Sequence, residues 1–309
     1  MNPFKSKKRT NPPIAYTTEP AAAWVFAPSP KYREVTAAKK PQYRLYTIPQ
    51  KGLIRLTESK RLSGYLPGLT PIHAEARNAI VEIIGVAGSE TFLEMEGRAD
   101  APDAKQARRL LDQVTMELKG GRLQLFNSPD GHNQHCLTEF TILCPKERRT
   151  TVRGSYSAVR LADLIAGADV ETNHARITIQ NVGPVVNARV EEGIIDYSGN
   201  EGSVRLFAGW ELNLNFVSQE FAGNVDAEAE GPVRVLIPEG FATCFEASIA
   251  KDAPFVCRTD IKSQIMERTK AGRLTYTFGQ GAPVIRLLSR KGPIVIDNTG
   301  DPLGEKQRD

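Results

Sequence analysis

Alternation of apolar and polar residues over short segments is the feature that most limits how this chain can fold. From Trp210 to Phe216, every second residue is large and apolar, and the residues between are Glu or Asn. A period of two is typical of a β-strand with one buried and one exposed face. The same alternation occurs at 176–180, 186–190, 225–229 and 273–278. We therefore expect half-buried strands, one after another, from about residue 170 to 298.

Turn-forming residues separate these predicted strands. Gly, Asn, Asp, Ser and Pro gather at 181–184, 192–193, 198–202, 231–232 and 291–293, as expected where strands end. No long amphipathic helical pattern interrupts the series. The 309 residues can hold one large or two modest domains, and their pattern predicts an all-β fold with one or two short helices.

A second group of predicted strands lies between residues 79 and 145. Segments 80–84, 91–95 and 139–144 have strand patterns. Segment 100–112 is predicted to be a short helix with Asp103 as its N-cap, because Ala104, Ala107 and Leu111 follow helical spacing. Gly120 and Gly121 separate two alternating segments, which predicts a β-hairpin.

Residues 148–167 interrupt the strand pattern. Val159, Ala162 and Ile165 follow helical spacing, with Leu161 and Leu164 beside them. We expect one or two helical turns here, laid over an open edge or end of the sheet. Such covers keep exposed strands from pairing with other chains.

A loose repeat is visible in the strand series. Segments 185–196 and 284–296 share the order strand, polar corner, Gly, strand, and Ile179, Ile195 and Leu212 lie 16 and 17 residues apart. This spacing favours a β-solenoid, a β-helix-like stack in which each coil buries its inner face against its neighbours. An antiparallel sandwich with strands every eight to twelve residues is the alternative.

Charge divides the chain unevenly. Residues 1–75 carry thirteen Lys or Arg against four Glu, a net charge of +9, whereas the whole chain has +4, so the remainder carries −5. Basic clusters at 5–9 and 39–40 could contact anionic membrane lipids. A basic arm on a mildly acidic body indicates that the arm meets anionic partners.

The pattern divides the chain into four regions. Residues 1–42 are rich in Pro, Lys and Ala and are predicted to be a flexible or extended arm. Residues 43–75 contain short strand-like pieces and form a small N-terminal extension. Residues 76–298 form the strand-repeat domain, and 299–309 a polar tail.

Segments of three kinds resemble a known family. Residues 79–125 have paired strands, a short helix and a hairpin, 140–145 and 233–238 are strands ending in Pro, and 281–296 has the form of a closing coil. Together they are similar to the bacterial putative-adhesin family of domains of unknown function, which contains β-strand repeats. The resemblance implies a solenoid-like fold and a role in adhesion or at the cell envelope. It supplies no catalytic residues.

One cluster has side chains suitable for a metal. Asp130, His132, His135, Cys136 and Cys144 lie within fifteen residues, and such groups bind zinc. Their spacing matches no standard zinc site, and adjacent His135 and Cys136 would point in opposite directions in a strand. We therefore expect no metal, and the four cysteines of the chain are too few for a disulfide framework.

Three carboxylates share one predicted strand face. Asp226, Glu228 and Glu230 alternate along the chain, about 7 Å apart from one to the next. This separation suits an inverting pair of glycosidase carboxylates, but it is also expected of any exposed strand face. Nucleophile, phosphate-loop and dinucleotide motifs are absent from the sequence.

We therefore expect a non-enzymatic structural or interaction protein without a cofactor, whose flat faces bind a protein or cell-surface partner or a second copy. One alternative is a cytoplasmic polymer-forming scaffold that the basic arm tethers to a membrane surface. A carbohydrate-active enzyme is another. We expect no nucleic-acid partner. The sequence has neither a signal-peptide pattern nor an apolar segment long enough to span a bilayer, which predicts a cytoplasmic location, with the cell envelope as the alternative.

Overall fold

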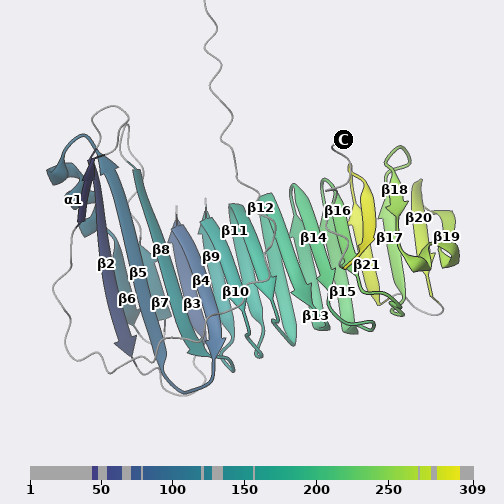
Figure 1. Cartoon of the computed structure of the whole chain (residues 1–309), viewed down its shortest axis with the longest axis horizontal. Helices are drawn as coiled ribbons and strands as arrows, with labels where there is room; N and C mark the ends of the chain where they lie inside the picture. Colours follow the sequence, from purple (N-terminus) through teal and green to yellow (C-terminus); the bar gives the residue numbers. More distant parts are fainter. Residues whose placement is uncertain are drawn as a thin grey trace, which may run out of the picture. The chain divides into compact units, whose positions relative to one another are not determined.

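The computed structural model describes residues 44–47, 54–64, 71–77, 79–119, 122–126, 135–155, 157–270, 272–279 and 284–299. Within these ranges the strands form one 20-stranded sheet and a two-stranded sheet, accompanied by one α-helix (Figure 1). The prediction of a mostly β fold is confirmed. The expected arm at 1–42, its basic clusters and most of the expected tail lie outside the described residues.

Most of the strands lie in two rows, and within each row neighbouring strands pair in parallel. Row 1 contains β3 (Ile72–Arg77), β9 (Thr150–Ser155), β13 (Glu201–Ala208), β15 (Ala222–Ala229), β21 (Ile285–Ser289) and β17 (Phe245–Ile249). Row 2 contains β8 (His135–Pro145), β4 (Ala79–Val86), β10 (Ser157–Ala162), β14 (Glu211–Phe216), β16 (Val233–Ile237), β22 (Ile294–Asn298) and β18 (Phe255–Cys257). Two longer strands, β11 (Ala168–Gln180) and β12 (Val185–Gly199), contribute to both rows.

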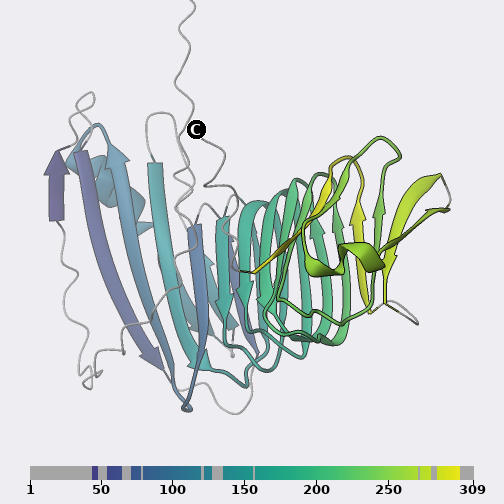
Figure 2. The same ribbon diagram turned by 45° about the vertical axis from the view of Figure 1, so that its right-hand side comes forward.

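One row-1 strand and the row-2 strand that follows it are here called a coil. Figure 2 shows several strands curving between the two rows. Inward-facing residues of successive coils stack in register, as Ile177, Ile195 and Leu212 do, all fully buried. The spacing of Ile179 and Ile195 seen in the sequence is two residues out of register, because Ile179 pairs with Tyr197.

The small and large residues beneath row 1 alternate along the stack. Val170, Ala188, Leu206, Ala227 and Leu287 occupy successive register positions and are all buried. Alternation of this kind lets neighbouring layers interdigitate without voids. Each fully buried Leu or Val contributes about 1.5–3 kcal/mol relative to an exposed one, so the stack is stabilised mainly by this inner ladder and its row-2 counterpart.

The predicted helical turns at 148–167 are wrong. Residues 157–162 form strand β10, with Val159 and Leu161 buried. It pairs in parallel with β4 on one side and β11 on the other. Val159 and Leu161 fit a period of two, whereas Val159 and Ala162 fit a helical one, and hydrogen-bonding partners on both sides decide in favour of the strand.

The corners between the rows explain a second correction. Trp210 does not share the buried face of Leu212 and Leu214: it lies before β14, 57% exposed. Its backbone N–H donates to the carbonyl of Gly193, 3.0 Å away, where β12 turns from row 1 to row 2. Strand β14 therefore begins after the corner, at Glu211. Trp210, which the sequence pattern included in the strand, lies at the corner itself.

Antiparallel strands flank β8 at one end of the stack. Here β5 (Thr91–Ala101) pairs with β8, β2 (Ile54–Gly64) with β5, and β1 (Arg44–Thr47) with β2. The predicted helix is α1 (Ala104–Asp112), and the Asp103 side chain caps it by accepting from the backbone N–H of Gln106 at 2.8 Å. The predicted hairpin is β6 (Thr115–Lys119) with β7 (Arg122–Phe126).

The other end is covered in a similar way. A hairpin of β19 (Met266–Lys270) and β20 (Arg273–Phe278) pairs antiparallel with β17, and the 3₁₀-helix η1 (Asp260–Gln264) precedes it. Tyr276 of β20 stacks on Phe255 of β18, with ring centroids 3.9 Å apart. The end coil and the hairpin are therefore packed together.

The coils are not stacked in the order of the chain. In row 1, β21 pairs with β15 on one side and with β17 on the other, although β17 comes before it in the sequence. In row 2, β22 lies in the same way between β16 and β18. The coil of β21 and β22 is thus inserted between two coils that precede it in the chain.

Candidate functional site

The cysteines of the candidate metal cluster lie at two places in one strand. Cys136 and Cys144 both belong to β8 and are both buried. Eight residues of extended strand separate them by about 26 Å, so one metal ion cannot bind both. The side chains of Asp130, His132 and His135 lie outside the described residues. Within the described part of the chain, no three His, Cys, Asp or Glu side chains are placed to hold a metal.

Burial also makes Cys144 unreactive. It raises the pKa of the Cys144 thiol to about 12, and the nearby positive charge of Arg148 only partly opposes this. The thiolate is the nucleophilic and metal-binding form of cysteine. Cys144 is therefore a packed thiol of the core.

The three carboxylates predicted to share a strand face are each paired with a cation. Asp226 and Glu228 face outward from β15, where Asp226 lies 3.3 Å from Arg286 and Glu228 2.5 Å from Arg290. Glu230 follows the strand and contacts Arg290 at 3.3 Å and Lys291 at 3.1 Å. The sequence indicated the carboxylates but not their partners, which come from a coil about 60 residues further along the chain.

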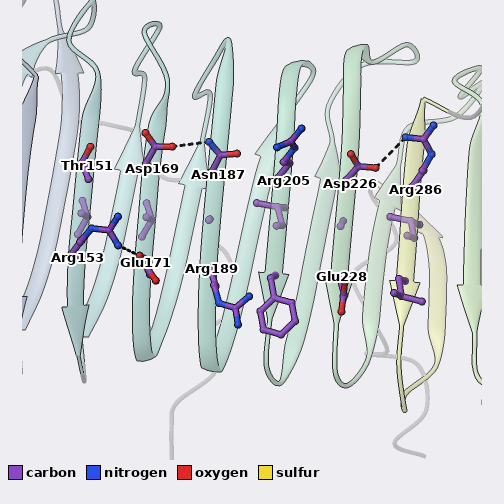
Figure 3. Close-up of a pocket in the computed structure, with 18 of the residues that line it drawn as sticks. Thr151, Arg153, Asp169, Glu171, Asn187, Arg189, Arg205, Asp226, Glu228 and Arg286 are labelled. Atoms are coloured by element: carbon purple, nitrogen blue, oxygen red, sulfur yellow. Dashed lines mark hydrogen bonds and ion pairs between the residues drawn. The ribbon is translucent and has the colours of Figure 1, made fainter.

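Asp226 and Glu228 form part of a long groove over row 1. It has a volume of about 1050 Å³ and crosses seven strands, from β9 to β17 (Figure 3). Outward-facing side chains line it above the buried small and large residues: Thr151, Arg153, Asp169, Glu171, Asn187, Arg189, Arg205, Phe207, Asp226, Glu228, Arg286, Leu288, Glu246 and Ser248. Its volume is in the range of ligand sites, but it is open along the sheet.

The groove side chains form two ladders in register across the strands. The first ladder runs Thr151, Asp169, Asn187, Arg205, Asp226, Arg286 and Glu246, and the second Arg153, Glu171, Arg189, Phe207, Glu228, Leu288 and Ser248. Paired strands lie about 4.8 Å apart. Each ladder therefore presents a side chain at about that interval along the groove, and all but Leu288 are polar, charged or aromatic.

Neighbouring members of the ladders bind one another. Asp169 accepts a hydrogen bond from Asn187 at 2.7 Å and pairs with Arg149 at 2.7 Å. Arg153 pairs with Glu171 on the next strand. These side chains are a third or more exposed, and exposed ion pairs stabilise a fold by at most about 1 kcal/mol. The ladders therefore contribute more to surface chemistry than to stability.

Asp169 is held in its ionised form. Burial alone raises the pKa of this carboxyl, but hydrogen bonds from Asn187 and Arg149, together with the charges of Arg149 and Arg153, lower it below its usual value. A general acid near neutral pH needs a raised carboxyl pKa. Asp169 is suited to accept hydrogen bonds and to hold its neighbours in place.

Comparison with known proteins finds likenesses to solved structures alone. No family model and no curated protein matches the chain. It is similar to the crystal structures of a "putative cell adhesion protein" from Clostridium sporogenes (11% identity, TM-score 0.31) and of "putative adhesins" from Bacteroides fragilis (13%, 0.29) and Parabacteroides distasonis (10%, 0.32). Each alignment covers 78% of this chain, and 100%, 97% and 97% of the respective structures. These neighbours are described as adhesins, as the sequence resemblance predicts. At such TM-scores they carry no further argument.

The sequence contained a signal for the groove that the strand pattern alone did not reveal. Asp169, Asn187 and Arg205 are 18 residues apart, as are Glu171 and Arg189. Aligning the chain on this interval would have placed these side chains in columns. Alternation identifies the exposed face of each strand, whereas the interval shows which exposed residues are neighbours. No described helix is long and apolar enough to cross a membrane.

Proposed function

We propose that the stack is a β-solenoid, that the chain is a non-enzymatic interaction protein of the adhesin type, and that the groove over row 1 is its binding surface. The observation that carries this proposal is the pair of ladders, which set hydrogen-bonding and charged groups across seven strands. A surface of this length suits an extended partner better than a small molecule. The solenoid supplies a rigid support, because every groove strand is hydrogen-bonded within its row.

The state of the carboxylates supports a binding role over hydrolysis. Asp226 and Glu228 are each engaged by an arginine, and the pKa of Asp169 is lowered. An inverting glycosidase needs one carboxyl group that is protonated near neutral pH. If the chain is nevertheless such an enzyme, wild type will release reducing ends from a panel of polysaccharides, and Asp226→Asn with Glu228→Gln will abolish the release.

A matched pair of substitutions tests the groove. Asn187 in row 1 and Asn213 in row 2 both face outward and donate to an aspartate of the preceding coil, at 2.7 and 2.9 Å. Asn187→Trp places a bulky ring in the groove, whereas Asn213→Trp makes the same change on the other row. We expect wild type and Asn213→Trp to bind at least one member of an array of surface polysaccharides and matrix proteins, and Asn187→Trp to lose that binding.

Two results would contradict the proposal. One is a wild type that binds nothing on the array, and the other is equal binding by the two tryptophan variants. Thermal unfolding of both variants establishes that each is folded before binding is compared. Protease shaving of intact cells separates an envelope location, in which the protein is removed, from a cytoplasmic one, in which it is protected.

A polymer-forming scaffold is the alternative function, but the described ends of the stack offer little support for it. Antiparallel strands lie at both ends, and covers of this kind limit end-to-end stacking of solenoids. Sedimentation over a hundredfold range of concentration tests this alternative. A sedimentation coefficient that rises steadily with concentration would favour the scaffold.

A further inference from the structure

Some of the charged side chains that line the groove have an ion-pair partner among the described residues, and others do not. Its lining holds five carboxylates and four arginines. Four of the carboxylates pair with arginines, as described above, and Glu246 also has an interaction partner. Two of the arginines, Arg153 and Arg286, are engaged by these carboxylates. The other two, Arg189 and Arg205, have no carboxylate partner among the described residues.

These two arginines lie on neighbouring strands near the middle of the groove. The Arg189 guanidinium carbon lies 4.3 Å from the ring centroid of Phe207. Arg205 occupies the register position between Asn187 and Asp226, and among the described residues its side chain forms neither an ion pair nor a hydrogen bond. Asp226 forms its ion pair with Arg286, at 3.3 Å, and none with Arg205. Figure 3 shows Arg205 on the strand between those of Asn187 and Asp226.

Asn187, Arg189, Arg205 and Phe207 therefore form a block, two residues from each of two adjacent strands. Across the strands they lie about 4.8 Å apart and along each strand about 7 Å. Arg205 and Asn187 lie toward one end of the block, and Arg189, over the Phe207 ring, lies toward the other, so the two guanidinium groups are separate. Guanidinium groups bind carboxylates through paired, charge-assisted hydrogen bonds, and the amide suits the hydroxyl groups of a sugar.

The same groove disfavours a densely charged partner. Five carboxylates line it, and each would repel an anion placed beside it, so a polymer with phosphates at every unit would meet repulsion along most of the groove. A polymer with a carboxylate on some units and hydroxyl groups on all of them meets cations in the block and hydrogen-bonding groups elsewhere. An extended peptide cannot add to row 1 as another strand here, because these strands are already paired on both sides.

We propose that the groove binds an acidic polysaccharide, with uronic-acid carboxylates held by Arg205 and by Arg189. This inference rests on the proposed function, in which the groove is the binding surface, and it adds the chemical class of the partner. The ladders place a polar or charged group at each coil, so a polymer lying along the stack meets such a group at each coil.

The test compares two forms of one polymer. Wild-type protein is titrated with hyaluronan, which carries a carboxylate on every second sugar, and with the same polymer carrying methyl-esterified carboxylates. We expect hyaluronan to bind at least tenfold more tightly, roughly the effect of one charge-assisted contact, and added salt to reduce the difference. Arg205→Gln and Arg189→Gln should each weaken binding of hyaluronan by about tenfold or more and leave binding of the ester nearly unchanged.

Row 2 provides the control variant. Arg160 faces outward from β10 and, like Arg205, has no ion-pair partner among the described residues, so Arg160→Gln removes the same charge away from the groove. It should leave binding unchanged, and unfolding temperatures should show that all three variants are folded.

The outcomes separate this inference from the proposed function. Equal binding of hyaluronan and its ester would overturn carboxylate recognition while leaving the groove as a binding surface. Binding of a protein on the array, together with no binding of either polymer, would have the same effect. Equal or tighter binding of inorganic polyphosphate would show that the groove selects anions by charge alone, which contradicts the inference. If wild type binds no partner at all, both proposals fail.

Discussion

At the scale of single residues, the most unusual group in the core is the hydroxyl of Tyr197. Its side chain is 2% exposed, and its Oη has no hydrogen-bond partner among the described residues. Burial raises the pKa of this hydroxyl well above its usual value, and the carboxylate of Glu201 adds to the effect. A buried hydroxyl without a partner has lost its hydrogen bonds to water and gained none in return.

We expect Tyr197→Phe to leave the free energy of unfolding unchanged or to raise it by up to about 1 kcal/mol, because it removes an unpaired polar atom and keeps the ring. Tyr276→Phe is the control, since the Tyr276 hydroxyl bonds to Glu267 and its loss should not stabilise. Urea denaturation of the two variants measures both effects. A clear loss of stability in Tyr197→Phe would mean that this hydroxyl has a partner.

The ionised state of Asp169 predicts a pH dependence. Since its pKa is lower in the folded protein than the usual 3.8, its stabilisation is fully present above that value and is lost as the pH falls through the lowered pKa. Asp169→Asn should therefore be less stable than wild type at pH 7, by about 0.5–1 kcal/mol for a partly exposed pair, and the difference should vanish in acid. Asp252→Asn, at an exposed turn, should show no such change, and a pH-independent deficit in Asp169→Asn would contradict the assignment.

At the scale of elements, the corners limit which residues the coils accept. A Cβ atom built on Gly193 would lie 1.9 Å from the carbonyl oxygen of Ala175 on the preceding coil. This oxygen belongs to backbone that is paired in the sheet, so it cannot move away without disturbing the stack. The need for glycine comes from the close approach of two coils.

We expect Gly193→Ala to lower the free energy of unfolding by about 1–3 kcal/mol, the usual effect of inserting a carbon atom into a packed site. Gly183→Ala is the matched control at the opposite corner, because the nearest atom to its Cβ would be a Glu201 carboxylate oxygen at 3.9 Å. Thermal unfolding compares the two variants. Equal unfolding temperatures would show that the coils can separate at Gly193.

Local sequence patterns predicted the individual helices and strands better than they predicted which strands pair with one another. The helix with its Asp103 cap, the hairpin after it and the strand at 225–229 follow from spacing within a few residues. Strand β10 was misread because its apolar residues fit two periods, and only its partners β4 and β11 distinguish them. The groove depends on register between distant segments, such as Asp226 and Arg286, which are 60 residues apart. Alternation within one strand contains no information about that register.

At the scale of the described stack, position in space and position in the chain differ. The coil of β21 and β22 is paired on both sides, whereas β18 pairs with β22 alone and β19 with β20 alone among the described strands. Protection of backbone amides follows pairing and burial. The backbone amides of the inserted coil should therefore be protected to the same degree as those in the middle of the stack.

Hydrogen–deuterium exchange measures this directly. We expect the amides of 285–289 and 294–298 to exchange as slowly as those of β12 and β14, and those of β18 and β19 to exchange much faster. Core residues Ile296 and Ile195, 1% and 0% exposed, serve as matched probes of the two coils. Fast exchange throughout 285–298 would show that the inserted coil opens independently of its neighbours.

The inserted coil also has a consequence for synthesis on the ribosome. Translation completes β15, β16, β17 and β18 before it reaches residue 284. The emerging chain therefore contains the coils on both sides of the inserted coil before it contains the inserted coil itself. Correct assembly of these coils must therefore await the arrival of β21 and β22. A chain that stops before residue 284 lacks an interior coil instead of an end coil. Premature termination therefore leaves unpaired strand edges on the two coils that β21 and β22 would have joined, and cellular quality control can detect such edges.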